Sequence, residues 1–146
     1  MADNTPSHRA PLGVILAAGR GTRLRPLTPD TPKALAPVLN RPLIAYAFDL
    51  LDTLGITETA VVLDGDDETV RAITSAFPPD REVAVACQTE ARGPADALAM
   101  VGDLLTDRDV VVVAVDTIIP GGDGLRSLWD GFRAAAARGE MVAMLP

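Results

Sequence analysis

Residues 16–27 read LAAGRGTRLRPL and place two glycines and three arginines directly after an apolar run. Gly19 and Gly21 let the backbone curve, so that successive N–H groups can face one ligand. The arginines at positions 20, 23 and 25 concentrate positive charge in the same short stretch. This combination is typical of a loop that binds an anion, and a phosphate group is the anion it suits best.

Lys33 follows this loop and is the only lysine among the 13 basic residues of the chain. Four prolines between positions 26 and 37 stiffen the stretch that carries Lys33 back toward the loop. Residues 19–41 form a long irregular stretch before the first expected helix, and loops of that length are usually functional or disordered. A solvated basic loop without a ligand is the simpler alternative.

Two common phosphate-binding loops are excluded by the spacing of these residues. A Walker A loop needs Gly-Lys-Ser/Thr after its first glycine, and none follows Gly19 at that spacing. A dinucleotide-binding loop needs a third glycine, and Leu24 stands at that position. A phosphate site in this loop would therefore belong to another class.

The composition restricts the class of protein further. A net charge of −7 argues against nucleic acid as a partner. The single cysteine, Cys87, cannot form an internal disulfide, which favours the cytoplasm. No apolar run approaches the ~20 residues of a membrane span, and the first eleven residues show no signal peptide. We expect a disordered polar tail over 1–12 and one domain over 13–146.

Five apolar runs alternate with segments of helical pattern. The runs cover 13–18, 59–63, 82–87, 111–115 and 141–145, and the helical segments cover 42–55, 66–77, 94–105 and 125–139. Runs that are apolar on both faces are typical of parallel strands covered on both sides. The sequence therefore predicts an α/β fold, a doubly wound, Rossmann-like and mostly parallel sheet of about five strands in three α/β/α layers. In such sheets, ligands bind beyond the carboxyl ends of the strands.

Residues 16–38 also resemble the signature of the sugar-phosphate nucleotidylyltransferases, L-A-x-G-x-G-T-R-L-x-P-L-T followed by P-K-x-L-x-P-V. The stretch QTEARGPADAL at 88–98 resembles the family segment in which a glutamine and a glycine flank the nucleobase. The stretch VVVAVDT at 111–117 resembles the strand whose closing aspartate binds Mg²⁺. The resemblance covers roughly 13–120 in the expected order and implies the nucleotide-diphospho-sugar transferase type of fold.

The resemblance implies a reaction in which a sugar 1-phosphate attacks the α-phosphorus of an NTP, so that pyrophosphate leaves and an NDP-sugar forms. By family position, the implied catalytic residues are Arg23 and Lys33, the implied nucleotide-binding residues are Ala17, Ala18, Gly19, Gly21, Thr22, Gln88 and Gly93, and the implied ligand of Mg²⁺ is Asp116. The backbone at 19–22 would cradle the triphosphate, Arg23 would bind the β- and γ-phosphates, and Lys33 the α-phosphate and the incoming phosphate.

Each of the weaker assignments has a structural alternative. Gln88 is equally well explained as a polar strand end, Gly93 as a turn residue, and Asp116 as the cap of the next turn. The base is left open, although the segment at 88–98 looks more like the uridylyl, thymidylyl or adenylyl branches than the guanylyl ones. The acceptor is open as well: a sugar, another polyol phosphate or phosphocholine.

The chain also departs from the family pattern. Val115 stands where the family usually has glycine, and Pro94 where threonine or leucine is common. The family's sugar-binding elements and second metal carboxylate have no evident counterpart within 1–146. An alternative function is therefore a non-catalytic NTP-binding or regulatory module, and we expect a second copy or a fuller partner subunit to cover the incomplete sheet.

Overall fold

The computed structural model describes residues 9–19, 21–22, 24, 30–64, 66–90, 92–119 and 122–140. Its elements in chain order are β1 (Leu12–Ala17), the 3₁₀ turn η1 (Lys33–Leu35), β2 (Pro37–Val38), β3 (Arg41–Pro42), α1 (Leu43–Thr53), β4 (Glu58–Asp64), α2 (Asp67–Thr74), β5 (Val83–Gln88), α3 (Pro94–Ala99), η2 (Gly102–Leu104), β6 (Val110–Ala114) and α4 (Asp123–Ala137). Within these described ranges, no helix is long and apolar enough to cross a membrane.

The main sheet holds four strands in the order β5-β4-β1-β6, and every neighbouring pair is parallel. The predicted parallel α/β fold is thereby confirmed. The fifth predicted strand, 141–145, lies outside the described residues. Leu12, expected in the polar tail, is instead the first residue of β1, because its N–H bonds to the carbonyl of Asp109 at 3.0 Å and its side chain is buried.

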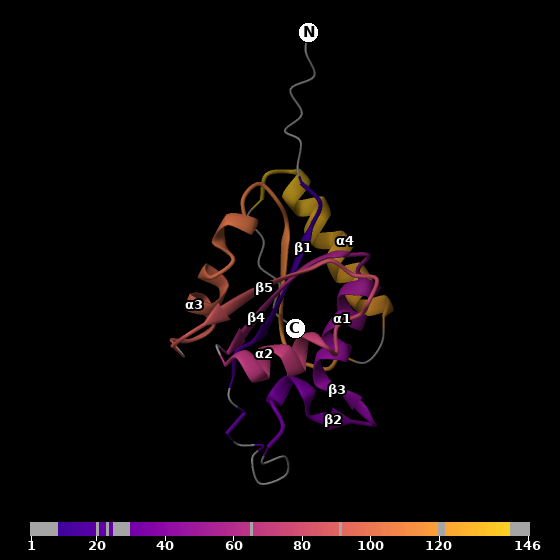
Figure 1. The fold of residues 1–146 in the computed structure, drawn as a ribbon. Helices are drawn as coiled ribbons and strands as arrows, with labels where there is room; N and C mark the ends of the chain where they lie inside the picture. Colours follow the sequence, from indigo (N-terminus) through magenta and orange to yellow (C-terminus); the bar gives the residue numbers. More distant parts are fainter. Residues whose placement is uncertain are drawn as a thin grey trace.

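Side chains of the sheet point alternately into two cores, as the pleat of a strand requires. One core joins Ile15, Val61, Leu63 and Val113 to apolar residues of α1, α2 and α4, namely Phe48, Leu51, Ile73 and Trp129. The other core joins Leu12, Val14, Ala60 and Val62 to Ala97 and Val101 of α3 and its following turn. Figure 1 shows α3 on one side of the sheet and α1 and α4 on the other, which gives three α/β/α layers.

The strand order reverses between β1 and β6. The chain passes from β1 to β4 and β5 in one direction and then returns to place β6 on the other side of β1. In doubly wound sheets this reversal opens a crevice beyond the carboxyl ends of the two strands, because their connections run apart. The ends of β1 and β6 are therefore the place to look for a ligand site.

The long irregular stretch contains more structure than the sequence suggests. Its second half forms η1 and the short antiparallel pair β2–β3, which packs beside α1. The Tyr46 hydroxyl donates to the carbonyl of Val38 at 2.7 Å, and Arg41 pairs with Asp49 at 2.8 Å. The hydrogen bond from Arg41 to Asp49 raises the pKa of the Arg41 guanidinium. These contacts tie the stretch after the glycine loop to the first helix.

Candidate functional site

The candidate site begins at the carboxyl end of β1. Ala17 is buried as the last residue of the strand, Ala18 is half-buried and Gly19 is exposed. An alanine pair at this point keeps the strand end narrow, so that a ligand can approach the backbone of the following loop.

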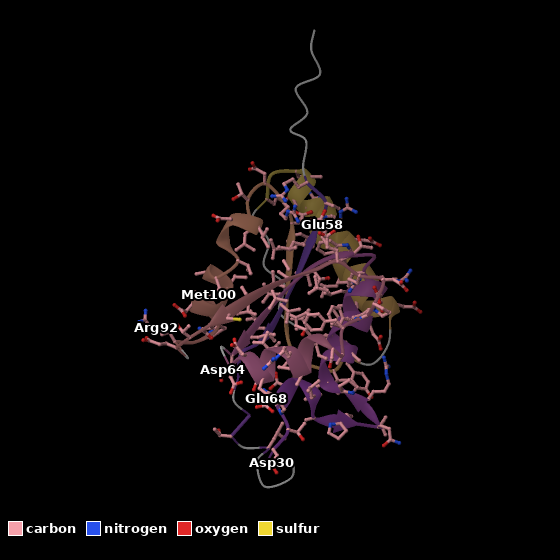
Figure 2. All side chains as sticks on the ribbon, viewed as in Figure 1. Asp30, Glu58, Asp64, Glu68, Arg92 and Met100 are labelled. Atoms are coloured by element: carbon pink, nitrogen blue, oxygen red, sulfur yellow. The ribbon has the colours of Figure 1, made fainter. Side chains whose placement is uncertain are left out.

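Figure 2 shows Asp64, the last residue of β4, at the opposite end of the sheet from Glu58, the first residue of β4.

Asp116 lies just beyond β6, at the same end of the sheet. The N–H of Val115 still bonds to the carbonyl of Leu16 at 3.1 Å, and a turn closed from Thr117 N–H to Ala114 C=O follows. Asp116 is therefore held in a tight turn next to the end of β1. Half of its side-chain surface, 50%, is exposed.

Lys33 and Asp116 are brought together although they are 83 positions apart in the chain. The Lys33 ammonium donates to Asp116 Oδ2 in an ion pair, and the Lys33 side chain is only 19% exposed. The sequence resemblance implies both residues at one site, and the structure places them in direct contact. A cation and a hard carboxylate side by side are suited to phosphate groups and to the divalent cation that accompanies them.

The position of Lys33 is fixed by its backbone. Lys33 begins the turn η1, in which Leu35 N–H bonds to Pro32 C=O at 2.8 Å and Ala36 N–H bonds to Lys33 C=O at 3.1 Å. Ala34 and Ala36 on either side of Leu35 are buried in the main core. The ammonium group is thus carried on an anchored segment, which lowers the entropy lost when it binds a charged ligand.

Gly21 packs directly against Lys33. Its φ of +58° lies in the left-handed region, and a Cβ built on it would stand 2.8 Å from Lys33 Cβ. A side chain at this position would be strained and would push Lys33 away. Gly19 differs, because a Cβ there meets nothing within 4 Å among the described residues. Thr22 is exposed, and Arg23, the second implied catalytic residue, lies outside the described residues.

Gln88 and Gly93 also lie close together, at the end of the outer strand β5. Gln88 is 6% exposed, and its Nε2 donates to Asp96 Oδ2 at 2.7 Å and, more weakly, to the carbonyl of Gly93 at 3.4 Å. Gly93 has a φ of +104° and is the N-cap of α3, so a non-glycine residue would be strained there. The simple strand-end explanation of Gln88 omits this specific contact with Asp96.

The register places the two halves of the candidate site along one edge of the sheet. Gln88 is paired with Asp64 on β4, Leu63 with Ala17 on β1, and Leu16 with Ala114 on β6. The ends of β5 and β6 are three strand spacings apart, roughly 14 Å. Sequence reasoning missed Asp96, because no local pattern marks its contact with Gln88.

Val115, one of the two residues that depart from the family pattern, does not crowd this edge. Its side chain is 2% exposed and belongs to the main core beside Val113. The valine therefore points into the protein, and the adjacent Asp116 faces outward. The loss of glycine before the aspartate does not obstruct the site.

Among the described residues, a single carboxylate, that of Asp116, is the proposed protein ligand for Mg²⁺. Within the part of the chain that the structure describes, no group of three or more His, Cys, Asp or Glu side chains is arranged to hold a metal ion. Mg²⁺ is nevertheless commonly bound by one or two carboxylates together with substrate phosphates. Asp116 therefore fits as one carboxylate ligand of Mg²⁺, with substrate phosphate oxygens as further ligands.

The family model described as nucleotidyl transferase matches residues 12–146, which is nearly the whole chain. The chain belongs to the nucleotidyl transferase family. The match includes the glycine loop, Lys33, Gln88 and Asp116, which the geometry above connects to one edge of the sheet.

Several relatives of this nucleotidyl transferase chain are named for the reaction that they carry out. It is 36% identical to the low-salt glycan biosynthesis nucleotidyltransferase Agl11 of Haloferax volcanii over 75% of this chain and 31% of that protein. It is 33% identical to a glucose-1-phosphate thymidylyltransferase of Streptomyces antibioticus over 84% of this chain and 35% of that protein. A mannose-1-phosphate guanylyltransferase 1 of Arabidopsis thaliana is 34% identical over 64% of this chain and 27% of its own length.

A solved structure agrees with the fold. The chain superposes with a TM-score of 0.77 and 29% identity on a Bacillus anthracis protein assigned as a glucose-1-phosphate thymidylyltransferase, in complex with sucrose. The match covers 86% of this chain and 51% of that one. The chain spans about a third of the length of the curated relatives named above.

Proposed function

We propose that this chain carries the nucleotide site of a Mg²⁺-dependent sugar-1-phosphate nucleotidyltransferase. The observation that carries the proposal is the Lys33–Asp116 ion pair at the β1/β6 switch point, packed against Gly21 of the glycine loop. The relatives named above act, by their names, on glucose 1-phosphate and mannose 1-phosphate. We propose an NTP and a sugar 1-phosphate as the substrates of this chain.

In the proposed reaction, an oxygen of the sugar 1-phosphate attacks the α-phosphorus of the NTP. The new P–O bond forms as the bond between the α-phosphorus and its bridging oxygen breaks, and pyrophosphate leaves. Negative charge accumulates on the attacking and leaving oxygens, so positioning and electrostatic stabilisation supply most of the catalysis. No side chain needs to form a covalent bond.

The residues of the chain divide this task. Backbone N–H groups of 19–22 cradle the triphosphate, and Arg23 binds the leaving pyrophosphate with its planar fork. The Lys33 ammonium binds the α-phosphate and the incoming phosphate, since it is a compact charge on an anchored turn. Asp116 would hold Mg²⁺, which supplies charge neutralisation at the phosphate oxygens when bound.

The base of the nucleotide is proposed to lie at the other end of the same edge, between Gln88 and Gly93. The span of roughly 14 Å across the strand ends suits a nucleotide with its base at β5 and its phosphates near β1 and β6. This arrangement makes Gln88 a base-binding residue, with the triphosphate running toward Gly19.

We further propose that the protein is cytoplasmic, because its single cysteine cannot form an internal disulfide. We also propose that it associates with a second copy of itself. The exposed side chains of Val112 and Leu128 lie beside a pocket of ≈ 460 Å³ on the β6 side, which Trp129 and Phe132 also line. Burial of this apolar surface would favour association. Sedimentation velocity should show mass rising with concentration, and a monomer at every concentration would contradict this proposal.

The test of the proposed function is pyrophosphate release. The chain would be incubated with Mg²⁺, each of the common NTPs, and glucose 1-phosphate or mannose 1-phosphate, beside Asp116→Asn as the variant and Asp103→Asn as the matched control. We expect release by the unmodified chain and the control, and loss in Asp116→Asn. NTP binding without turnover across the whole panel would favour the non-catalytic module instead.

A further inference from the structure

Asp96 is an acidic residue of the first turn of α3, and its carboxylate is used in an unusual way. It accepts the side-chain amide of Gln88 at 2.7 Å across eight positions of the chain. A first-turn acid normally faces the N–H groups of its own helix. Here the carboxylate instead contacts the one residue at the end of β5 that is buried and polar.

Both partners of the Gln88 amide group are acceptors. The carboxylate of Asp96 and the carbonyl of Gly93 have no hydrogen to donate, so Gln88 must direct its NH₂ group at them. A rotated amide would set the Gln88 carbonyl against two oxygens and lose a charge-assisted hydrogen bond. Both side-chain hydrogen bonds of Gln88 in the described ranges are donated by Nε2, and they fix the orientation of the amide group.

We propose that Asp96 is a positioning residue that makes Gln88 an acceptor-only reader of the nucleobase. Because Asp96 holds one amide hydrogen and the carbonyl of Gly93 accepts more weakly from the same nitrogen, Oε1 is the group of Gln88 left to meet a ligand. The site then selects a base with a ring N–H on its Watson–Crick edge, which uracil, thymine and guanine have and cytosine and adenine lack. This inference rests on the proposed function, because it assumes that a nucleotide binds beside Gln88.

The chemistry of the pyrimidines makes the selection sharp. Uracil carries an N–H at ring position 3, which donates to Gln88 Oε1, whereas cytosine carries a lone pair at the same position. Two acceptors would face each other in the cytosine complex, and turning the Gln88 amide to relieve them would break its 2.7 Å hydrogen bond to Asp96. UTP and CTP have the same sugar, phosphates and ring size and differ only at ring positions 3 and 4, so the change in their preference on replacing Asp96 reports how the Gln88 amide is held.

The test is calorimetric binding of UTP and CTP, in the presence of Mg²⁺, to the unmodified chain, Asp96→Ala, Asp96→Asn and Asp103→Asn. Asp103 is an exposed first-turn acid of the neighbouring turn η2 and serves as the matched control. We expect the unmodified chain and the control to prefer UTP by about tenfold, as one well-placed base contact gives. Asp96→Ala should reduce the preference to about twofold or less, since Gln88 is then able to rotate.

The test depends on the ratio of UTP affinity to CTP affinity, and not on either affinity alone. If Asp96 had only a structural role, Asp96→Ala would weaken the binding of UTP and CTP equally and leave the ratio of their affinities unchanged. That result would overturn the inference. Asp96→Asn should give an intermediate ratio, because its amide oxygen still accepts from Gln88 Nε2 while its NH₂ group is also able to donate to Oε1 of the rotated form.

Failure of the proposed function would look different from failure of this inference. Equal binding of UTP and CTP by the unmodified chain would overturn the role of Asp96 and leave the nucleotide site intact. The absence of binding by every NTP, with the fold confirmed by circular dichroism, would overturn both.

Discussion

Lys33 combines an anchored backbone with a charged end that reaches across the switch point to Asp116. The turn that carries it is held between the buried Ala34 and Ala36. Its charge is therefore held near the end of β6 before any ligand binds. This pairing is the most direct link between the glycine loop and the strand that supplies the proposed metal carboxylate.

Replacement of Lys33 by alanine should remove binding energy for phosphate while leaving the fold intact. The ion pair is partly exposed, so its loss costs about 0–1 kcal/mol of folding free energy. Pyrophosphate release should fall by about 10²–10³-fold, the usual effect of removing one group that stabilises developing charge. Steady-state kinetics and thermal melts measure the two quantities.

The exposed Arg133 on α4 provides the matched control for Lys33. Arg133→Ala removes one positive charge on α4, outside the proposed site, and should change neither activity nor melting temperature. An equal loss of activity in the two variants would mean that net charge, and not the position of Lys33, is responsible.

The two glycines of the loop should respond differently to alanine. Gly19→Ala adds a methyl group where no described atom lies within 4 Å, so the melting temperature should not change. NTP affinity should fall by about tenfold, because the methyl group occupies space proposed for phosphate and overpacking costs about 1–3 kcal/mol. Calorimetry and a thermal melt of one preparation test both points.

Gly21→Ala should damage the fold as well as the site. The added Cβ clashes with Lys33 and requires a left-handed backbone, which costs about 1–2 kcal/mol for an L-residue. We expect a lower melting temperature together with weaker NTP binding. Equal melting temperatures for the two glycine variants would contradict the contact between Gly21 and Lys33.

Sequence reasoning reaches some of these residues and not others, for physical reasons. Lys33 and Asp116 stand at fixed places in a motif, so the resemblance alone is enough to imply them. The role of Asp96 depends on the distance between a strand end and a helix, which no local pattern encodes. The same holds for Val115, whose effect is decided only by which way its side chain points.

At the scale of elements, the helix ends follow local rules. Asp66 caps α2, and its Oδ1 accepts from the N–H groups of Glu68 at 2.8 Å and Thr69 at 3.1 Å. Gly55 and Gly139 follow α1 and α4 with positive φ, as their positions in the sequence predict. Strands of the sheet were also predictable within one or two residues, since each is a short apolar run.

The segment 94–105 shows where such rules stop. The sequence predicts one helix, and the structure forms α3 followed by the separate turn η2. Gly102 disfavours continuation of the helix, and Val101 between the two pieces is buried in the second core. The helical periodicity of the sequence thus continues through Gly102, whereas the α-helix ends before it.

Removal of the α2 cap should destabilise the protein by a measurable amount. Asp66→Ala leaves two N–H groups without their side-chain acceptor, and such caps are worth about 1 kcal/mol. Urea denaturation should show this loss. Asp67→Ala, one position later in the same turn, should cost clearly less, and equal costs would contradict the capping role of Asp66.

At the scale of the whole molecule, the two ends of the sheet have different tasks. The candidate site lies at the carboxyl ends of the strands, whereas two ion pairs with nearly buried arginines lie at the amino ends. Arg108 is 2% exposed and pairs with Glu58 at 2.6 Å, and Arg81 is 8% exposed and pairs with Asp52 at 2.5 Å. These pairs line a pocket of ≈ 700 Å³. The first connects the segment before β6 to the start of β4, and the second connects the segment before β5 to α1.

Disruption of the amino end should affect stability without affecting the site. Glu58→Gln leaves the buried Arg108 without its carboxylate, which should cost about 1–3 kcal/mol. Because Glu58 and Asp64 lie at opposite ends of the sheet (Figure 2), NTP affinity at a temperature where the protein is folded should not change. Urea denaturation and calorimetry check the two statements, and a loss of affinity would mean that the two ends are coupled.

An NMR titration of the ¹⁵N-labelled chain with UTP and Mg²⁺ would locate the nucleotide on the sheet. Amide signals of 17–22, Lys33, Gln88, Gly93 and Asp116 should shift together as one site fills, while Glu58, Arg81 and Arg108 stay unchanged. Shifts confined to the amino end of the sheet, or no shifts at saturating nucleotide, would contradict a nucleotide site at the β1/β6 switch point.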